Sequence, residues 1–550
     1  MNPEPDATAQ LHAAADDLWA RLLETSPLIG TFIGDPTYDD RMPRIDEDGR
    51  EREGAMFAAA DAAVAGIDAA ALEPTDRDTL AILQAIVARG MSRLTSRYDR
   101  YEVSSHLDGA VSALGVVASV QRADSPEALD RYEARLRDFG RYLDEATGLA
   151  REGVAAGVVP PRVIVERTVA QVERILGMGV EGSPAMAPAQ DDAARERLAG
   201  AVRDVVLPAH ERFGEAIRDE VLPAAPETIG LAALPGGDEL YRSEIVGWTT
   251  LALDPQDVHR IGTDRFAAIA EERRTIAAGL GYASAAEAIE ARTAAGENGF
   301  ASVEELLAAV EDQVARSWEA APAWFGRLPS TNCAIRRVEE FREADQPFAF
   351  YNPPTEDGSR PGTYYVNGYA LEQRARHQVP GVTFHEANPG HHFQITLEQE
   401  MPDRHPLRRY GGFMVGAAFA EGWGLYAERL ADEMGLYLDE WERLGMLENQ
   451  ALRAARLVTD TGIHALGWTR EQAVALLRDG GQSPSDAAIE VDRYISVPGQ
   501  ALCYTTGMIE IERAREKAEA DGRPLRDFHD DVLAHGSLPL SAFRRAFGTD

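Results

Sequence analysis

The sequence is poor in cysteine, in lysine and in long apolar runs. Cys333 and Cys503 are the only cysteines, too few for a disulfide framework or a cysteine-rich metal site. Lys517 is the only lysine, so the basic residues are nearly all arginine. No stretch approaches about 18 uninterrupted apolar residues, and the acidic N-terminal residues lack the apolar region of a signal peptide. We therefore expect a soluble, cytoplasmic protein without a membrane partner.

The charge balance is strongly acidic. The 550 residues carry a formal net charge of −36, which argues against nucleic acid or an anionic membrane as a partner. Apolar residues make up 45% of the chain, enough for a large core. The charge by itself indicates nothing about the substrate or the oligomeric state.

The helical period dominates the chain. Apolar residues recur every three or four positions in four long stretches, at 130–153, 194–222, 302–325 and 440–462. Strand-like sequence is scarce, and its best candidates are 333–341, 347–352 and 363–368. No repeat or low-complexity linker divides the chain. The sequence predicts a mostly α fold in one domain, 1–550, with a mainly helical half (1–330) and a half with a small sheet before the histidine cluster (331–550).

The histidine cluster lies in "FHEANPGHHFQ", residues 384–394. On a regular helix His391 would lie about 120° around from His385, and His392 would share its face but sit roughly 10 Å further along. Neither could then join His385 on one zinc ion, because each Zn–N bond is about 2.0–2.1 Å. Pro389 clashes with the carbonyl of His385, and Gly390 permits unusual backbone angles. Together they can open the helix and return a later histidine to the first, His391 being favoured and His392 the alternative.

A third ligand is available on the apolar helix predicted at 411–435. Glu421 lies among small and aromatic residues there, and Glu428 shares its face seven residues later. A buried carboxylate is costly unless it is paired or bound to a metal. An ion pair of Glu428 with Arg456 is the simpler alternative. Two histidines and one glutamate leave a fourth position for water, as in catalytic zinc sites, although Mn²⁺ or Co²⁺ would accept the same ligands.

Four segments resemble the signatures of a known family. They are "HEANPGHHFQ", "EGWGLYAERL", "LVTDTGIHALGWTREQA" and "DRYISVPGQALCYTTGMIEI", in this order between residues 347 and 511. They are similar to the bacterial "domain of unknown function 885" family. That family is similar in fold to carboxypeptidase Taq-type enzymes and, more remotely, to the angiotensin-converting enzyme-like gluzincin metallopeptidases. The Pro-Gly insertion in the first segment departs from those peptidases.

The resemblance implies one large, mostly helical fold with a deep central cleft and a zinc-peptidase-like site. It implies His385 and His391 (or His392) as ligands, Glu421 as third ligand and Glu386 as general base. One Zn²⁺ per chain is expected on this basis, with Glu386 taking a proton from the attacking water and passing it to the leaving amine.

Oxyanion donors and substrate contacts come from the segments around these ligands. The resemblance to zinc peptidases that use a tyrosine here favours Tyr504, although it could be a packed helix residue. Arg493, Tyr494 and Gln500 are further candidates in the same segment.

Two more groups of residues are placed by spacing and by chain order. Asp460 and His464 lie one helical turn apart, so they form either a simple buried pair, outer partners of the ligands or groups on the substrate side. Glu428 is a further candidate for an outer partner of the ligands. Tyr364, Tyr365 and Asn367 would line an edge strand that holds an extended substrate, or would cover the core.

Three classes of function are compatible with the sequence. The first is a zinc-dependent metallopeptidase that hydrolyses small peptides, in the manner of a carboxypeptidase or dipeptidase. The second is a zinc enzyme for a non-peptide amide or another small metabolite. The third is an inactive helical binding protein, against which the intact His385–Glu386 pair and Glu421 argue.

Overall fold

The computed structural model describes residues 6–338, 343, 348–354, 361–371, 374–401 and 404–550. Contacts within the chain group it into two compact units. The first comprises Met1–Glu244, Gly462–Glu471 and Ala488–Pro498, and the second Ile245–Thr461, Gln472–Ala487 and Gly499–Asp550. The boundary between them does not coincide with residue 330, where the sequence suggested two halves.

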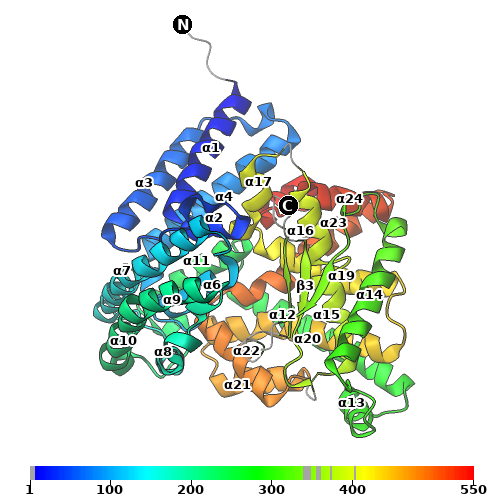
Figure 1. Ribbon diagram of the computed structural model, residues 1–550. Helices are drawn as coiled ribbons and strands as arrows, with labels where there is room; N and C mark the ends of the chain where they lie inside the picture. Colours follow the sequence, from blue (N-terminus) through cyan, green and yellow to red (C-terminus); the bar gives the residue numbers. More distant parts are fainter. Residues whose placement is uncertain (1–5, 339–342, 344–347, 355–360, 372–373, 402–403) are drawn as a thin grey trace. The chain divides into compact units, whose positions relative to one another are not determined.

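The first unit is helical throughout the part described (Figure 1). Helix α7 shows why these helices begin and end where they do. The Ser125 side chain accepts a hydrogen bond from the Ala128 amide, Pro126 occupies the first turn, and Gly157 ends the helix in the left-handed conformation. Its helices are α1 (Ala7–Thr25), α2 (Pro27–Ile33), α3 (Glu47–Val64), α4 (Pro74–Ser96), α5 (Asp99–Glu102), α6 (Ala113–Val120), α7 (Pro126–Ala156), α8 (Arg162–Gly182), α9 (Asp192–Ala201), α10 (Leu207–Ala216) and most of α11 (Gly237–Thr249).

The helix predicted at 194–222 is interrupted by two π-helical turns. Val202–Val206 separates α9 from α10, and Ile217–Val221 follows α10. A π turn widens the helix by one residue per turn, so it shifts which side chains face inward. The valines and isoleucine at the ends of both turns are buried in the core of this unit.

The second unit combines helices with the small sheet. Its elements are α12 (Pro255–Gly279), α13 (Ala285–Ala294), α14 (Val303–Trp324), β1 (Ala334–Arg337), β2 (Ala349–Asn352), β3 (Thr363–Val366), α15 (Val379–Glu386), α16 (His391–Gln399), α17 (Pro406–Tyr410), α18 (Gly412–Val415), α19 (Ala417–Glu433), α20 (Glu440–Leu466), α21 (Arg470–Asp479), α22 (Pro484–Ser496), α23 (Cys503–Ala520), α24 (Leu525–His535) and α25 (Leu540–Phe547). The last residues of α20, the first of α21 and the end of α22 belong to the first unit. The predicted mostly α fold with one small sheet is confirmed.

The sheet has the order β1-β3-β2. Strand β3 pairs in parallel with β1 and antiparallel with β2. It is therefore the central strand, and the expectation that Tyr364 and Tyr365 line an edge strand was wrong, because both sides of β3 already carry partners. Tyr364 is fully buried, whereas the ring of Tyr365 stacks on Phe350 with centroids 5.0 Å apart. Asn367 is buried and donates from Nδ2 to the Glu343 carbonyl oxygen.

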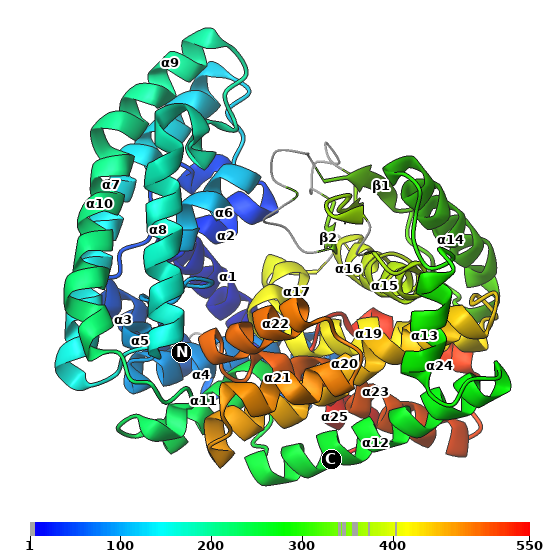
Figure 2. The ribbon, with the colours of Figure 1, turned by 90° about the horizontal axis from the view of Figure 1, so that it is seen from below.

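Helices α14 and α15 pack against this sheet (Figure 2). Val310 on α14, Tyr364 and Val366 on β3, and Val379 on α15 belong to one buried cluster. The sheet thus supports α15, the helix that carries His385.

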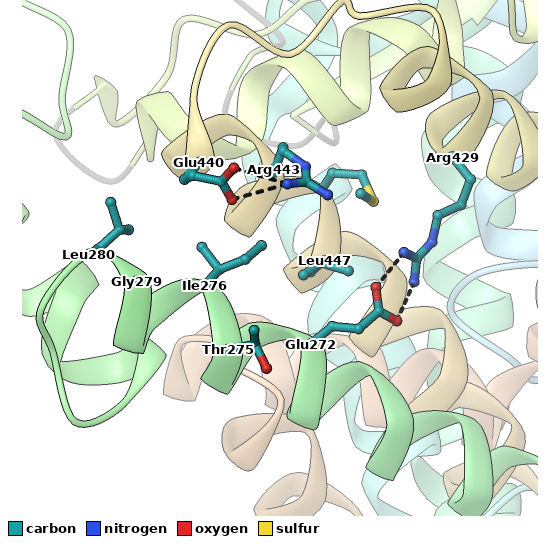
Figure 3. Close-up of a pocket in the computed structure, with 10 residues that line it drawn as sticks. Glu272, Thr275, Ile276, Gly279, Leu280, Arg429, Glu440, Arg443 and Leu447 are labelled. Carbon is teal, nitrogen blue, oxygen red and sulfur yellow. Dashed lines mark hydrogen bonds and ion pairs between the residues drawn. The ribbon is translucent and has the colours of Figure 1, made fainter.

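A depression with a volume of about 500 Å³ lies among α12, α19 and α20 (Figure 3). Its arginines are already paired, Arg429 with Glu272 and Arg443 with Glu440. Its lining includes none of the predicted metal ligands, and we assign it no role. Among the described residues, no helix combines the length and the apolar character needed to cross a membrane.

Candidate metal centre

The predicted helix break lies between α15 and α16. Helix α15 ends at Glu386 and α16 begins at His391. Ala387 has φ −99° and ψ −113°, and Gly390 has φ −80° and ψ −129°, so the backbone leaves the helical region on both sides of the loop. The break that Pro389 and Gly390 predicted is confirmed.

Close packing and one tryptophan hold the loop. A β-carbon on Gly390 would come within 1.9 Å of the His385 carbonyl oxygen, so only glycine lets the chain turn back this tightly. The Trp423 indole donates to the Pro389 carbonyl oxygen at 2.8 Å, and Asn388 Nδ2 donates to Asn332 Oδ1 at 2.7 Å. The loop is therefore tied to α19 and to the segment before β1.

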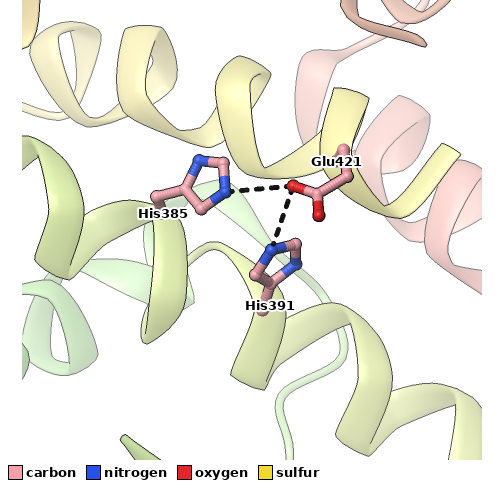
Figure 4. A group of neighbouring side chains, drawn as sticks. All are labelled: His385, His391 and Glu421. Carbon is pink, nitrogen blue, oxygen red and sulfur yellow. Dashed lines mark ion pairs between the residues drawn. The ribbon is translucent and has the colours of Figure 1, made fainter. Parts of the chain in front are cut away.

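His385, His391 and Glu421 come together from three helices, α15, α16 and α19 (Figure 4). Their ligand atoms lie within 4.8 Å of one another. Glu421 Oε2 is 3.4 Å from His385 Nε2 and 3.5 Å from His391 Nε2. Two ligands of a tetrahedral zinc ion with bonds of about 2.05 Å are separated by about 3.3 Å. Both separations to Glu421 and the two-nitrogen, one-oxygen donor set fit such an ion.

His392, the alternative ligand, is engaged elsewhere. Its Nε2 lies 3.0 Å from the Thr331 carbonyl oxygen and its Nδ1 lies 3.0 Å from the Tyr351 hydroxyl. The side chain is fully buried, and burial lowers its pKa to about 4, so the ring is neutral. The structure thus brings His391, and not His392, to His385 and Glu421.

Glu428 orients His385 from the opposite side of the ring. Its Oε1 accepts a hydrogen bond from His385 Nδ1 at 2.9 Å, and its Oε2 accepts one from Gln450 Nε2 at 2.9 Å. Glu428 is therefore not paired with Arg456, whose guanidinium lies over the Tyr504 ring at 4.2 Å. A carboxylate on the far nitrogen fixes the ring and makes Nε2 a better metal ligand.

The charges at the centre shift several pKa values. Burial disfavours a charged His385, but its contacts with Glu421 and Glu428 outweigh this and raise its pKa to about 10. Burial likewise opposes ionisation of Glu421, yet the two histidines hold its pKa well below the usual range. Burial raises the pKa of Glu386, although the nearby histidines counteract it. A carboxyl with a raised pKa next to a metal ligand is suited to accept and return a proton.

Three further predicted residues lie in the same unit as the centre. Tyr504 is buried near the start of α23, against Arg456. Asp460 accepts hydrogen bonds from the Gly499 amide through both carboxylate oxygens, at 3.1 Å each, and so fixes the turn just before Gln500. The catalytic role of Tyr504 and the substrate contact of Gln500 stay predictions.

The remaining predicted residues belong to the first unit. Tyr494 donates to Glu490 at 2.7 Å, and Arg493 lies 3.8 Å from the same carboxylate. His464 uses both ring nitrogens on backbone groups, Nδ1 with the Leu231 amide and Nε2 with the Tyr494 carbonyl oxygen. Its structural role therefore differs from the predicted pairing with Asp460.

Sequence reasoning missed several residues that support the ligands. Gln450 holds Glu428, Trp423 anchors the Pro389 carbonyl, and Gly424 leaves room for the His385 ring, since a β-carbon there would come within 2.6 Å of it. Trp423 and Gly424 follow Glu421 closely in the sequence, so their position could have identified them as residues that pack around the ligands. The role of Gln450 could not be predicted in this way, because its partner Glu428 lies 22 positions away in the chain.

Comparison with known proteins identifies relatives of the whole chain. The profile of a family described as "Bacterial protein of unknown function (DUF885)" matches residues 27–547. No curated protein matches the chain. The crystal structure of a candidate lipoprotein from Colwellia psychrerythraea is similar, with 25% identity and a TM-score of 0.89 over 99% of both chains. A candidate lipoprotein of unknown function from Shewanella oneidensis shares the fold, with 18% identity and a TM-score of 0.75, over 98% of this chain and 99% of that one.

Proposed function

The chain belongs to the DUF885 family of bacterial proteins, and from the geometry of its own residues we propose that it is a zinc-dependent hydrolase acting on small peptides. The observation that carries the proposal is the convergence of His385, His391 and Glu421, whose ligand atoms lie within 4.8 Å of one another. Three protein ligands of this kind leave the fourth position of a zinc ion to water or substrate. The resemblance of "HEANPGHH" to gluzincin motifs supports peptide hydrolysis in particular.

The outer contacts of the ligands also favour catalysis. Glu428 and Gln450 hold His385 in a fixed orientation, as metal-binding histidines require. Glu386 is on the last turn of α15 directly after His385, so it points about 100° away from that ring and is free to act as a base.

The proposed reaction uses Glu386 as the proton carrier. When bound, zinc would supply a Lewis acid that polarises the scissile carbonyl and lowers the pKa of an attacking water. Glu386 takes a proton from that water as its oxygen joins the carbonyl carbon. The carbon–nitrogen bond then breaks, and Glu386 returns the proton to the leaving amine. Tyr504 is the proposed donor to the oxyanion.

The first experiment combines metal analysis with one substitution. Protein purified without chelators should contain about one zinc ion per chain. Glu386→Gln keeps the size and hydrogen bonding of the side chain but removes the base. It should retain zinc while losing hydrolysis of a mixed peptide library by roughly 10²–10⁴-fold. Elemental analysis and mass spectrometry of the digested library measure both quantities.

The outcomes separate the three classes of function. Far less than one equivalent of any divalent metal would refute the metal centre and leave a binding protein. Zinc with no peptide cleavage, but with hydrolysis of non-peptide amides, would favour the second class. Loss of zinc in Glu386→Gln would make Glu386 a ligand and overturn its assignment as base.

A further inference from the structure

Among the described residues, Arg453 on α20 lacks the acidic partner that arginines of this chain commonly have. It forms no ion pair with any residue in the described part of the chain. Within that part, the one hydrogen bond of its side chain runs from Nη1 to the Asn449 carbonyl oxygen at 3.4 Å, and its Nε is buried without a partner. On the same helix, Arg443 pairs with Asp432 and Glu440. An unpaired guanidinium is conspicuous in a protein with a net charge of −36.

The packing of helices α15 and α20 places Arg453 level with the end of α15. Helices α15 and α20 run side by side in the same direction. A β-carbon on Gly445 would meet the His377 carbonyl at 1.8 Å, and one on Gly381 would meet Asn449 Nδ2 at 2.7 Å. Arg453 lies one helical turn beyond Asn449, which brings it level with the end of α15, where His385 and Glu386 lie.

A further chain of contacts agrees with this placement. Gln450, three residues before Arg453, reaches Glu428 and through it His385. Arg453 therefore lies level with the end of α15, and no ion pair joins it to Glu386 among the described residues.

A carboxylate is the group that such a side chain binds best. The planar guanidinium offers a fork of N–H donors that matches two carboxylate oxygens, and these charge-assisted hydrogen bonds are stronger than neutral ones. Because a partly buried cation without a partner is unfavourable, an incoming anion gains from pairing with it. In a peptide cut at its last bond, the terminal carboxylate lies within about one residue, roughly 3.5 Å, of the scissile carbonyl.

We propose that Arg453 binds a free carboxylate of the substrate, so that the centre acts on peptides or N-acyl amino acids close to their C-terminal end. The inference rests on the proposed hydrolase function for its chemistry. Recognition of the carboxylate, however, can be measured without turnover, which keeps the two proposals separable.

The test measures binding in the zinc-loaded Glu386→Gln protein. A pool of N-acetylated tripeptides of mixed sequence is offered as free acids together with the same pool as C-terminal amides, and bound peptides are quantified by mass spectrometry. The acids should be retained at least about tenfold more strongly than the amides. Arg453→Gln should lower retention of the acids by roughly 10–100-fold, to the level of the amides, and Arg453→Lys should restore part of it.

Arg443→Gln is the matched control, because it removes the same charge from the same helix where the arginine is already paired. It should leave the preference for acids unchanged. Zinc content and circular dichroism of each variant verify that it is folded. Equal retention of acids and amides, or retention of neither, would overturn the inference while zinc binding and cleavage could still hold. If the protein binds no zinc but still retains free acids over amides through Arg453, the proposed hydrolase function is refuted and a carboxylate-binding site remains.

Discussion

At the scale of single residues, the two nitrogens of His385 face two different carboxylates. Nδ1 contacts Glu428, which is fully buried, and Nε2 faces Glu421, which is 24% exposed. Only Glu421 is shared with a second histidine. The difference in neighbours assigns Glu421 to the metal and Glu428 to the support of the ring.

The two adjacent histidines should respond differently to truncation. His391→Ala removes one of three ligands and should abolish stoichiometric zinc binding. His392→Ala removes the partner of Tyr351 and of the Thr331 carbonyl, so it should lower stability but weaken zinc binding only by about 10–100-fold. Competition with a zinc-sensitive dye measures both affinities. If His392→Ala loses the metal and His391→Ala keeps it, the ligand assignment is wrong by one residue.

The sequence predicted most of these residues but not all of their roles. The cluster of His385, Glu386 and His391 could be recognised because its members are close in the chain and a helix break explains their spacing. The choice between His391 and His392 could not be made with certainty, since it depends on backbone angles at Ala387 and Gly390. Nothing in the sequence singled out Arg453, because only the packing of the described residues shows that this arginine has no acidic partner among them.

At the scale of elements, the short loop between α15 and α16 brings together two histidines that a regular helix would hold apart. It ends α15 after Glu386 and starts α16 at His391, which places both histidine rings at one carboxylate. Pro389 and Gly390 allowed this helix break to be predicted from the sequence. The order of the strands could not be predicted from the sequence, because the pairing of a strand depends on segments elsewhere in the chain. Strand β3 is therefore the central strand and not the expected edge strand.

The loop offers a test of how strictly the elements position the ligands. In Gly390→Ala the new β-carbon would meet the His385 carbonyl oxygen at 1.9 Å, so the loop must shift. We expect a loss of about 1–3 kcal/mol in the free energy of unfolding and at least a tenfold loss of zinc affinity. Denaturant unfolding and zinc competition measure the two effects.

Gly279→Ala is the control for this substitution. Gly279 is the last residue of α12, and a β-carbon there meets nothing within 4 Å. Its variant should bind zinc like the parent protein. Equal zinc affinity of Gly390→Ala and Gly279→Ala would show that the loop tolerates a side chain and that its tight turn does not set the ligand positions.

At the scale of the whole molecule, the chain is acidic, mostly α and divided into two compact units. Helical periodicity predicted the fold class because it is local to each segment. The division into units was not visible, since each unit is assembled from segments far apart in the chain. The deep central cleft and the cytoplasmic location stay predictions.

Each unit holds a buried neutral histidine, and this predicts how stability depends on pH. In the first unit, His464 accepts from the Leu231 amide at Nδ1 and donates to the Tyr494 carbonyl at Nε2. In the second, His529 donates from Nδ1 to the Trp324 carbonyl and accepts from the Tyr426 hydroxyl at Nε2. A second ring proton would break one of these hydrogen bonds in either case. Burial lowers the pKa of both histidines to about 4.

The unfolded chain therefore binds a proton at each histidine below about pH 6.5, where the folded chain does not. This contribution to the free energy of unfolding is fully present above about pH 6.5 and is lost as the pH falls toward 4, by about 1.4 kcal/mol per pH unit for each group. Denaturant unfolding of metal-free protein between pH 7.5 and 4.5 should show the decline. His464→Gln and His529→Gln should each reduce the slope of the free energy of unfolding against pH by the equivalent of about one proton. Above pH 7 this slope should be the same as in the parent protein. Unaltered slopes in both variants would mean that these rings are protonated in the folded protein, against the hydrogen bonds that hold them.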